Sequence, residues 1–145
     1  MKVESPAFAQ HESIPVKYTC QGEDISPPLK FLDIPKDTVS LAIIIEDPDA
    51  PTGTFDHWIA WNIPPEKTTL NEGDTVPNQG VNHYHQNRYR GPCPPKGNAH
   101  RYFFKVFALD TKLDLPNGST KDALLKAMNG HILGQAELVG TYKRQ

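Results

Sequence analysis

Apolar segments with the character of β-strands are separated along this chain by proline and polar loops. Residues 29–34 end at Pro35, and residues 38–46 form a nearly continuous, β-branched apolar segment, which is typical of a strand buried on both faces. Residues 57–63 predict a third strand. That strand ends before Pro64 because proline cannot donate a hydrogen bond to a sheet.

The segment from residue 101 to residue 109 predicts a central strand, because both of its faces are largely apolar. One face carries Tyr102, Phe104, Val106 and Ala108, and the other carries Phe103, Lys105, Phe107 and Leu109. Residues 136–142 predict a closing strand. Residues 68–79 are polar and rich in turn residues, so we expect a loop there.

One helix is predicted near the end of the chain. Ser119 or Thr120 can cap it, and Gly130 supplies the residue that ends it. Its apolar side would carry Leu124, Leu125 and Met128. A run of strands followed by one late helix indicates a mainly β domain, in which two antiparallel sheets pack together and one or two short helices are added.

Length and charge narrow the classes of protein that fit. A chain of 145 residues without a linker predicts a single domain over residues 1–145. The 15 Lys and Arg residues against 17 Asp and Glu residues give a net charge of −2, so no basic field would attract nucleic acid. The apolar run 41–45 is too short for a membrane span, and the start lacks a secretion signal. We therefore expect a soluble cytoplasmic protein without membrane insertion.

The two cysteines, Cys20 and Cys93, lie far apart and lack the paired spacing of a zinc site. In a reducing cytosol both are expected to be free thiols. For Cys93 we favour the role of a small buried hydrophobic residue, and a reactive thiol is the alternative.

Two motifs carry the candidate chemistry. The first is Asp47-Pro48-Asp49-Ala50-Pro51 followed by His57-Trp58, and the second is Gly91-Pro92-Cys93-Pro94-Pro95 followed by His100-Arg101-Tyr102. Each joins a loop stiffened by proline to titratable side chains at the edge of an apolar strand. Such an arrangement suits a small preformed pocket. Neither motif contains an activated nucleophile, so the sequence favours a binding site over an active site.

These motifs, together with residues 18–29 and 136–142, resemble the phosphatidylethanolamine-binding protein family, specifically its short bacterial and archaeal branch, which is called Raf kinase inhibitor-like. The resemblance runs nearly from end to end. It implies a β-sandwich with a pocket at one end that binds phosphate-like anions and head-group analogues. By resemblance, that pocket would be lined by Asp47, Asp49, His57, Gly91, Cys93, His100 and Tyr102.

The resemblance also allows a cis bond between Ala50 and Pro51, since cis costs a prolyl bond only about 0.5–1 kcal/mol. Three departures from the animal members limit what it implies. The stretch between Pro51 and His57 is short, positions 92 and 93 differ, and the chain lacks the extra C-terminal helix of those members. Kinase regulation and its phosphorylation switch are therefore not transferred to this chain.

Within the expected pocket, Gly91 would let a ligand approach the backbone, and most recognition would come from side chains. His57 and His100 would donate hydrogen bonds when charged, and Tyr102 would donate its hydroxyl. Phosphate-type ligands should then bind more weakly as the pH rises through the histidine range, around 6.5.

The acidic residues of the motifs need a role beside an anion. Asp47 and Asp49 would each hold a histidine in its protonated form, or one of them would face the amine of a zwitterion such as a phosphoethanolamine head group. Arg101 is expected to pair with a carboxylate and support the loop.

The leading hypothesis is therefore a non-catalytic binding protein for a small phosphorylated or zwitterionic ligand, with no cofactor and no metal, that modulates a protein partner. The main alternative is an enzyme, in which the Asp and His residues form a metal centre or an acid–base pair. A third is inhibition of proteases or kinases through surface loops, as is known among relatives. The resemblance allows a homodimer, although no apolar patch in the sequence marks an interface.

Overall fold

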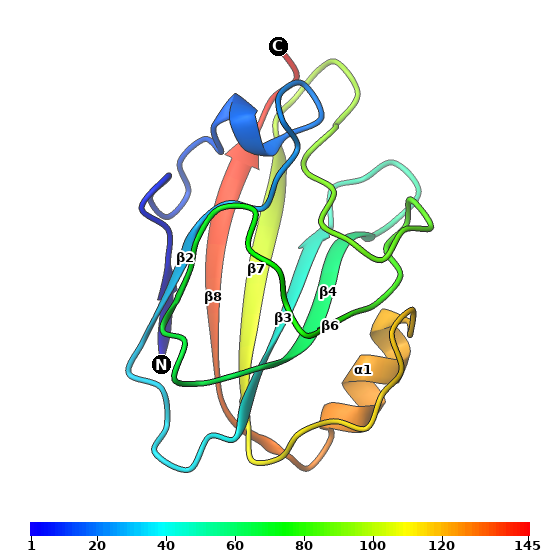
Figure 1. Cartoon of the computed structure of the whole chain (residues 1–145). Coiled ribbons are helices and arrows are strands. Elements are labelled where there is room, and N and C mark those ends of the chain that lie inside the picture. Colours follow the sequence, from blue (N-terminus) through cyan, green and yellow to red (C-terminus); the bar gives the residue numbers. More distant parts are fainter.

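In the computed structural model, which describes residues 1–145, two antiparallel sheets pack face to face and one helix covers part of the larger sheet (Figure 1). The larger sheet has the order β6-β4-β3-β7-β8, with β6 at Asn78–Gln79, β4 at Phe55–Ile63, β3 at Ser40–Asp47, β7 at His100–Leu109 and β8 at Ile132–Tyr142. The smaller has the order β1-β2-β5, with β1 at Lys2–Glu4, β2 at Leu29–Leu32 and β5 at Thr69–Leu70. The helix α1 spans Lys121–Met128, and a 3-10 turn, η1, spans Val16–Tyr18. The predicted fold class is confirmed.

The predicted strands are present, but two of them are longer than their apolar patterns indicated. β4 begins at Phe55, because Phe55 and Asp56 pair with the end of β3. β8 begins at Ile132, because its largely exposed first half pairs with the end of β7. The short strand β1 was not predicted, and β5 and β6 lie within the expected loop over residues 68–79.

The core has two parts, one on each face of the larger sheet. Between the sheets, Leu41, Ile43 and Ile45 of β3 pack in one cluster with Phe31 of β2 and Phe104 of β7. On the opposite face a second cluster lies beneath the helix, and it contains Ala42, Ile44, Ile59, Trp61, Leu124 and Met128. Successive residues of a strand point to opposite faces, so β3 is buried on both, as its sequence predicts.

The helix begins and ends at the predicted residues. The Thr120 side chain accepts a hydrogen bond from the Ala123 N–H at 3.2 Å, and Gly130 adopts a φ of 83° beyond the helix end. Leu124 is fully buried, as predicted. Leu125 is 43% exposed, so the prediction that it lies on the apolar side of the helix is wrong. No helix in the structure is long and apolar enough to cross a membrane.

Chain reversals bring the two motifs to one end of the larger sheet. β3 ends where β4 and β7 begin, and this end is uppermost in Figure 1. Asp47 lies opposite Phe55 of β4, and Glu46 lies opposite Phe103 of β7. The next position of the β7 pairing places Tyr102 beside Asp47, so antiparallel pairing alone assembles one wall of the candidate site.

Candidate functional site

The ends of β3, β4 and β7 enclose a cavity of about 220 Å³ with the loops that follow them. Five of the seven predicted site residues line it, namely Asp47, His57, Cys93, His100 and Tyr102. The rest of the lining comes from residues 50–52, Phe55, Tyr84 and residues 94–95. The two motifs, which are separated by more than thirty residues of chain, therefore meet at one cavity.

A β-bulge directs His57 into this cavity. Ile45 of β3 pairs with Trp58, but the next residue, Glu46, pairs with Asp56, so His57 is an extra residue in β4. A bulge re-aims the side chain that it carries. As a result Asp56 lies on the helix side of the sheet, where Lys121 binds both Glu46 and Asp56, and His57 lines the cavity.

His57 is held as a neutral ring, which differs from the charged donor that we predicted. Its Nδ1 lies 2.8 Å from the carbonyl oxygen of Arg90, and since a carbonyl only accepts, Nδ1 carries the proton. Burial lowers the pKa of His57, whose side chain is 3% exposed, below its ordinary value. Its Nε2 makes no hydrogen bond within the protein. At neutral pH His57 therefore offers a lone pair, not a positive charge.

Asp47 and His100 form a hydrogen-bonded pair across β3 and β7. His100 Nδ1 donates to Asp47 Oδ2 at 2.7 Å, and the Asp49 N–H donates to Asp47 Oδ1 at 2.7 Å. Both carboxylate oxygens of Asp47 are therefore engaged, and the pair fixes the orientation of the imidazole. His100 Nε2 is left without a partner in the protein. The expectation that Asp47 pairs with a histidine is confirmed, and the charge of that histidine stays a prediction.

Tyr102 presents a hydroxyl group that has no hydrogen-bond partner. Its side chain is 1% exposed and lines the cavity, and the hydroxyl makes no hydrogen bond of regular geometry within the protein, although the Asp47 carboxylate lies close to it. Burial, and next the negative charge of Asp47, raise the pKa of this hydroxyl well above its ordinary value. Tyr102 is therefore a neutral donor, and a buried polar group without a partner calls for an explanation.

Two aromatic side chains that sequence analysis missed, Phe55 of β4 and Tyr84, also line the cavity. The ring of Phe55 lies 5.0 Å from His57 and 4.9 Å from Tyr84, and the ring of Tyr102 lies 5.4 Å from His57. Phe55 follows a turn-rich segment, so no local pattern placed it in a strand. Only its pairing with Asp47 brings it to the cavity, and strand pairing is not visible in a single sequence. Tyr84 stands between two histidines in a polar segment, and nothing there pointed to the cavity.

Asp49 does not line the cavity and holds an arginine instead of a histidine. Its carboxylate accepts two hydrogen bonds from the Arg101 guanidinium, at 2.8 and 2.9 Å, and one from the Arg101 N–H at 2.9 Å. The Arg101 guanidinium lowers the pKa of Asp49 to about 2. The prediction that Arg101 supports the loop is confirmed, whereas Asp49 as a partner of histidine is wrong.

Gly91 also lies outside the lining, and its small size serves packing between two loops. A Cβ at this position would lie 2.0 Å from the carbonyl oxygen of Tyr18 and 2.9 Å from Cα of Thr19. The Gly91 N–H donates to Asp24 Oδ1 at 2.7 Å, so it is not free for a ligand. The close approach that we predicted is therefore made by residues 18–19 and not by a bound molecule.

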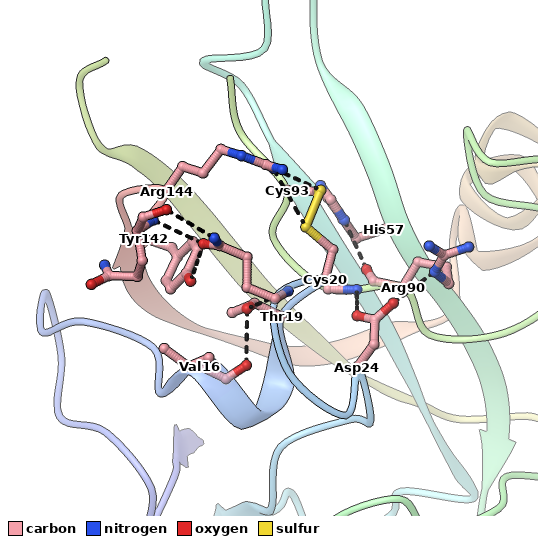
Figure 2. The surroundings of a disulfide bond; sticks show 12 residues. Val16, Thr19, Cys20, Asp24, His57, Arg90, Cys93, Tyr142 and Arg144 are labelled. Carbon is pink, nitrogen blue, oxygen red and sulfur yellow. Dashed lines mark hydrogen bonds and ion pairs between the residues drawn. A yellow bond between two sulfur atoms is a disulfide. The ribbon is translucent and has the colours of Figure 1, made fainter. Parts of the chain in front are cut away.

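Cys20 and Cys93 form a disulfide, which contradicts the predicted free thiols (Figure 2). Their Cα atoms are 5.4 Å apart although 73 residues separate them in sequence. The prediction failed because it took the redox state from an assumed compartment, while the pairing is set by how the loop around residue 20 packs against residues 90–93. Cytoplasmic location stays a prediction.

The disulfide is one of several ties between the loop 18–24 and the segment 90–93. The Cys20 N–H donates to the Pro92 carbonyl at 3.1 Å, and Asp24 accepts from Arg90 Nε at 2.7 Å as well as from Gly91. Figure 2 shows Asp24, Arg90 and His57 in one chain of contacts beside the disulfide. The segment 90–93, which leads into the cavity lining at residues 93–95, is thus fastened to the N-terminal part of the chain.

The bond between Ala50 and Pro51 is trans, and the structure contains no cis peptide bond, so that expectation is wrong. The loop reverses with ordinary turns: the Asp49 N–H bonds to the Asp47 side chain, and the Gly53 N–H bonds to the Ala50 carbonyl. A trans bond accommodates both, and trans is the preferred state even before proline.

Two other features bear on where a ligand could bind. A larger groove, of about 480 Å³, runs between β1 and residues 136–138 of β8, but it contains no histidine and no unpartnered buried polar atom. No group of three or more His, Cys, Asp or Glu side chains is arranged to hold a metal ion. The unsatisfied hydroxyl of Tyr102 makes the smaller cavity the better candidate.

Comparison with known proteins agrees with this architecture. The chain matches the family model "Phosphatidylethanolamine-binding protein" over residues 4–143. It is 47% identical to a UPF0098 protein of Methanothermobacter thermautotrophicus, with 99% of each chain covered, and 49% identical to one of Chlamydia pneumoniae, again with 99% of each covered.

Among solved structures, it is similar to a phosphatidylethanolamine-binding protein homologue of Chlamydia trachomatis, with a TM-score of 0.96, 45% identity, and 99% of this chain and 97% of that one covered. It is also similar to YbcL of Escherichia coli, described as a member of the mammalian family, with a TM-score of 0.91, 30% identity, and coverage of 99% and 98%. The chain belongs to the phosphatidylethanolamine-binding protein family.

Proposed function

We propose that this protein binds, without chemical conversion, a small ligand that carries a singly charged phosphate group, in the cavity between Asp47, His57, His100 and Tyr102. The single observation that carries the proposal is the Tyr102 hydroxyl, which is buried at the cavity and has no partner. Leaving a buried donor unsatisfied costs about 1–3 kcal/mol, and a ligand oxygen at this position would recover that free energy.

The polar atoms around the cavity suit a phosphate that is still protonated or esterified. The Tyr102 hydroxyl donates, and His100 Nε2 donates when its ring is charged, so both can bind a phosphate oxygen. His57 Nε2 accepts, and therefore suits a P–OH group or the ammonium of a zwitterionic head group. No lysine or arginine lines the cavity, which disfavours a doubly charged anion beside Asp47.

The absence of an activated nucleophile supports binding over catalysis. Thr52, Tyr84 and Tyr102 carry the hydroxyl groups at the cavity, and none of them hydrogen-bonds to a histidine. Cys93 is in a disulfide and both oxygens of Asp47 are engaged. Incubation with p-nitrophenyl phosphate and p-nitrophenyl acetate should give no turnover above the buffer rate, and turnover lost in Tyr102→Phe would contradict the proposal.

Calorimetric titration with O-phosphorylethanolamine and with dimethyl phosphate tests the binding directly. Dimethyl phosphate keeps a single charge from pH 5 to 8, so any pH dependence of its affinity comes from the protein. Affinity that falls with rising pH would identify a protonated imidazole as one of the donors, because a charged ring carries two N–H donors and a neutral ring only one. Tyr102→Phe should weaken binding about tenfold, the loss expected for one hydrogen bond.

Tyr18→Phe is the matched control, because it removes a phenol hydroxyl that bonds to Glu72, away from the cavity. It should leave the affinity unchanged. A flat or rising affinity with pH would reject His100 as the charged donor. Equal affinity in wild type and Tyr102→Phe would reject the cavity as the phosphate site.

A further inference from the structure

The disulfide stands at the surface, at the point where the cavity meets the tail of the chain. Both Cys20 and Cys93 are only partly buried, and Cys93 itself lines the cavity. The guanidinium of Arg144 lies against both sulfur atoms, with its Nη1 at 3.4 Å from Cys93 Sγ and 3.8 Å from Cys20 Sγ (Figure 2). A structural disulfide in a hydrophobic core has neither this exposure nor a charged neighbour.

Arg144 is held in place without being neutralised. No carboxylate in the protein forms an ion pair with it. The tail that carries it is fastened to Gln21, the neighbour of Cys20: Gln21 Oε1 accepts from the Tyr142 hydroxyl at 2.6 Å and from the Gln145 N–H at 2.9 Å, and Gln21 Nε2 donates to the Gln145 carbonyl at 3.0 Å. The positive charge of Arg144 therefore lies beside two neutral sulfur atoms. It would stabilise a negative charge there only after the disulfide is cleaved and one sulfur becomes a thiolate.

We propose that the Cys20–Cys93 disulfide is a thiol-exchange site for low-molecular-weight thiols, and that Arg144 stabilises the Cys93 thiolate that leaves when Cys20 is attacked. The attacking thiolate forms a bond to Cys20 Sγ, the bond between Cys20 and Cys93 breaks, and its electron pair stays on Cys93 beside Arg144. A second thiol then attacks the mixed disulfide and releases Cys20. Two thiols are oxidised to one external disulfide, and the two cysteines are reduced.

The fold can survive this exchange, because the other ties between the two loops do not involve sulfur. The Cys20 N–H still bonds to the Pro92 carbonyl, and Asp24 still binds Arg90 and Gly91. Reduction therefore frees one side chain in the cavity wall while the backbone around it stays anchored. If the proposed phosphate binding holds, on which this last step rests, the reduced protein should bind phosphate more weakly, since Cys93 no longer shapes the wall.

The kinetics of reduction by glutathione test the exchange site without reference to any ligand. Alkylation followed by mass spectrometry measures the rate of reduction. This rate should be proportional to the glutathione concentration, because the thiol attacks the native protein directly. Arg144→Gln should react about three- to tenfold more slowly, because the leaving thiolate loses its charged partner, and Arg144→Lys should restore part of the rate. Lys143→Gln, which removes an exposed neighbouring charge, is the matched control and should react like wild type.

Any of three results would overturn the proposal. The first is a rate that reaches a plateau with thiol concentration, which means that unfolding must come first. The second is an Arg144→Gln variant that reacts as fast as wild type, and the third is reduction that abolishes the near-ultraviolet circular dichroism of the fold. Dimethyl phosphate titrations of the oxidised and reduced proteins test the link to the cavity. Unequal affinities support the link, and equal affinities refute it. If neither state binds, the proposed function fails, and the NMR shifts of the His57 and His100 rings in the two states decide the link instead.

Discussion

The two walls of the cavity are built in different ways. The sheet wall, with Asp47, His100 and Tyr102, lies on the paired ends of β3 and β7, where hydrogen bonds between strands fix the backbone. The loop wall, residues 93–95, has no sheet partner, and the segment 90–93 that leads into it is held to residues 18–24 by side chains and by a disulfide. Polar atoms for a ligand are concentrated on the sheet wall, whereas the loop wall contributes shape.

This difference indicates which wall should matter more for ligand binding and which should matter more for the stability of the fold. Strand pairing positions the sheet wall as part of the fold itself, so changes there should affect binding more than stability. The loop wall depends on a few contacts between segments that are distant in sequence, so changes there should affect stability first. Five variants test that contrast.

The largest effect is expected from removing the disulfide. The double variant Cys20→Ser/Cys93→Ser should lower the free energy of unfolding by about 4 kcal/mol, because the cross-link spans 73 residues and limits the unfolded chain. Denaturant unfolding of the wild type and the double variant measures the difference in free energy, at equal protein concentration and under conditions in which the disulfide is neither reduced nor exchanged. A loss below about 1 kcal/mol would mean that the hydrogen bonds of residues 90–92 hold this wall by themselves.

Gly91→Ala should lower the free energy of unfolding by about 3 kcal/mol, because the new Cβ would lie 2.0 Å from the Tyr18 carbonyl and the backbone must move. Thermal unfolding measures the loss. Gly97→Ala serves as the control: φ is +135° there, nothing lies within 4 Å, and only the backbone conformation is strained, at about 1 kcal/mol. Equal losses in the two variants would contradict close packing of the loop wall.

Tyr102→Phe on the sheet wall should raise the free energy of unfolding by about 1–2 kcal/mol, since it removes a buried hydroxyl without a partner. The same variant should lose ligand affinity, so stability and function change in opposite directions. Urea unfolding in a buffer free of phosphate is the measurement. A destabilised variant would mean that the hydroxyl is satisfied within the protein.

His57 should make stability fall in acid. Its pKa in the folded protein lies below the unfolded value of about 6.5, so below that pH the unfolded chain binds the proton more readily. The free energy of unfolding should drop by at most about 1.4 kcal/mol per pH unit from this group, beginning near pH 6.5 as the pH decreases. In His57→Asn, whose amide can still donate to Arg90 and does not titrate, the slope between pH 6.5 and 5 should be shallower. An unchanged slope would show that His57 takes up its proton without cost.

The smallest effect is expected at the ion pair outside the cavity. Asp49→Asn should lower the free energy of unfolding by about 0.5 kcal/mol at pH 7, because Arg101 is 55% and Asp49 30% exposed and water screens the pair. The folded pKa of about 2 lies below the ordinary value, so this contribution is present above about pH 4 and is lost as the pH falls toward 2. Urea unfolding at pH 7 and pH 2.5 should show a smaller difference between the two proteins at pH 2.5 than at pH 7.

Much of the fold followed from local patterns. The apolar β-branched run of β3 and the two-sided apolar pattern of β7 predicted central strands, and Thr120 and Gly130 marked the helix. The limits of β4 and β8 were not predicted, because residues 55–56 and 132–135 show no alternation of apolar and polar residues and become strands only through pairing. The short β1 has too few residues for any periodicity to show.

The candidate site divides along the same line. Asp47, His57, His100 and Tyr102 were named from the two motifs, and they lie at the cavity. Phe55 and Tyr84 were missed, since neither an isolated aromatic residue nor a polar loop signals a cavity. Whether these residues bind a ligand stays a prediction, which the titrations described above test.

By itself, the sequence determined which segments become strands and which loops carry the chemistry, because both depend on local periodicity, proline and residue type. Only the tertiary structure decided the state of the groups. It paired Cys20 with Cys93, turned His57 inward through a bulge and kept it neutral, and gave Asp49 to Arg101. Charge, redox state and hydrogen bonding depend on neighbours that are distant along the chain, and folding alone brings those neighbours together.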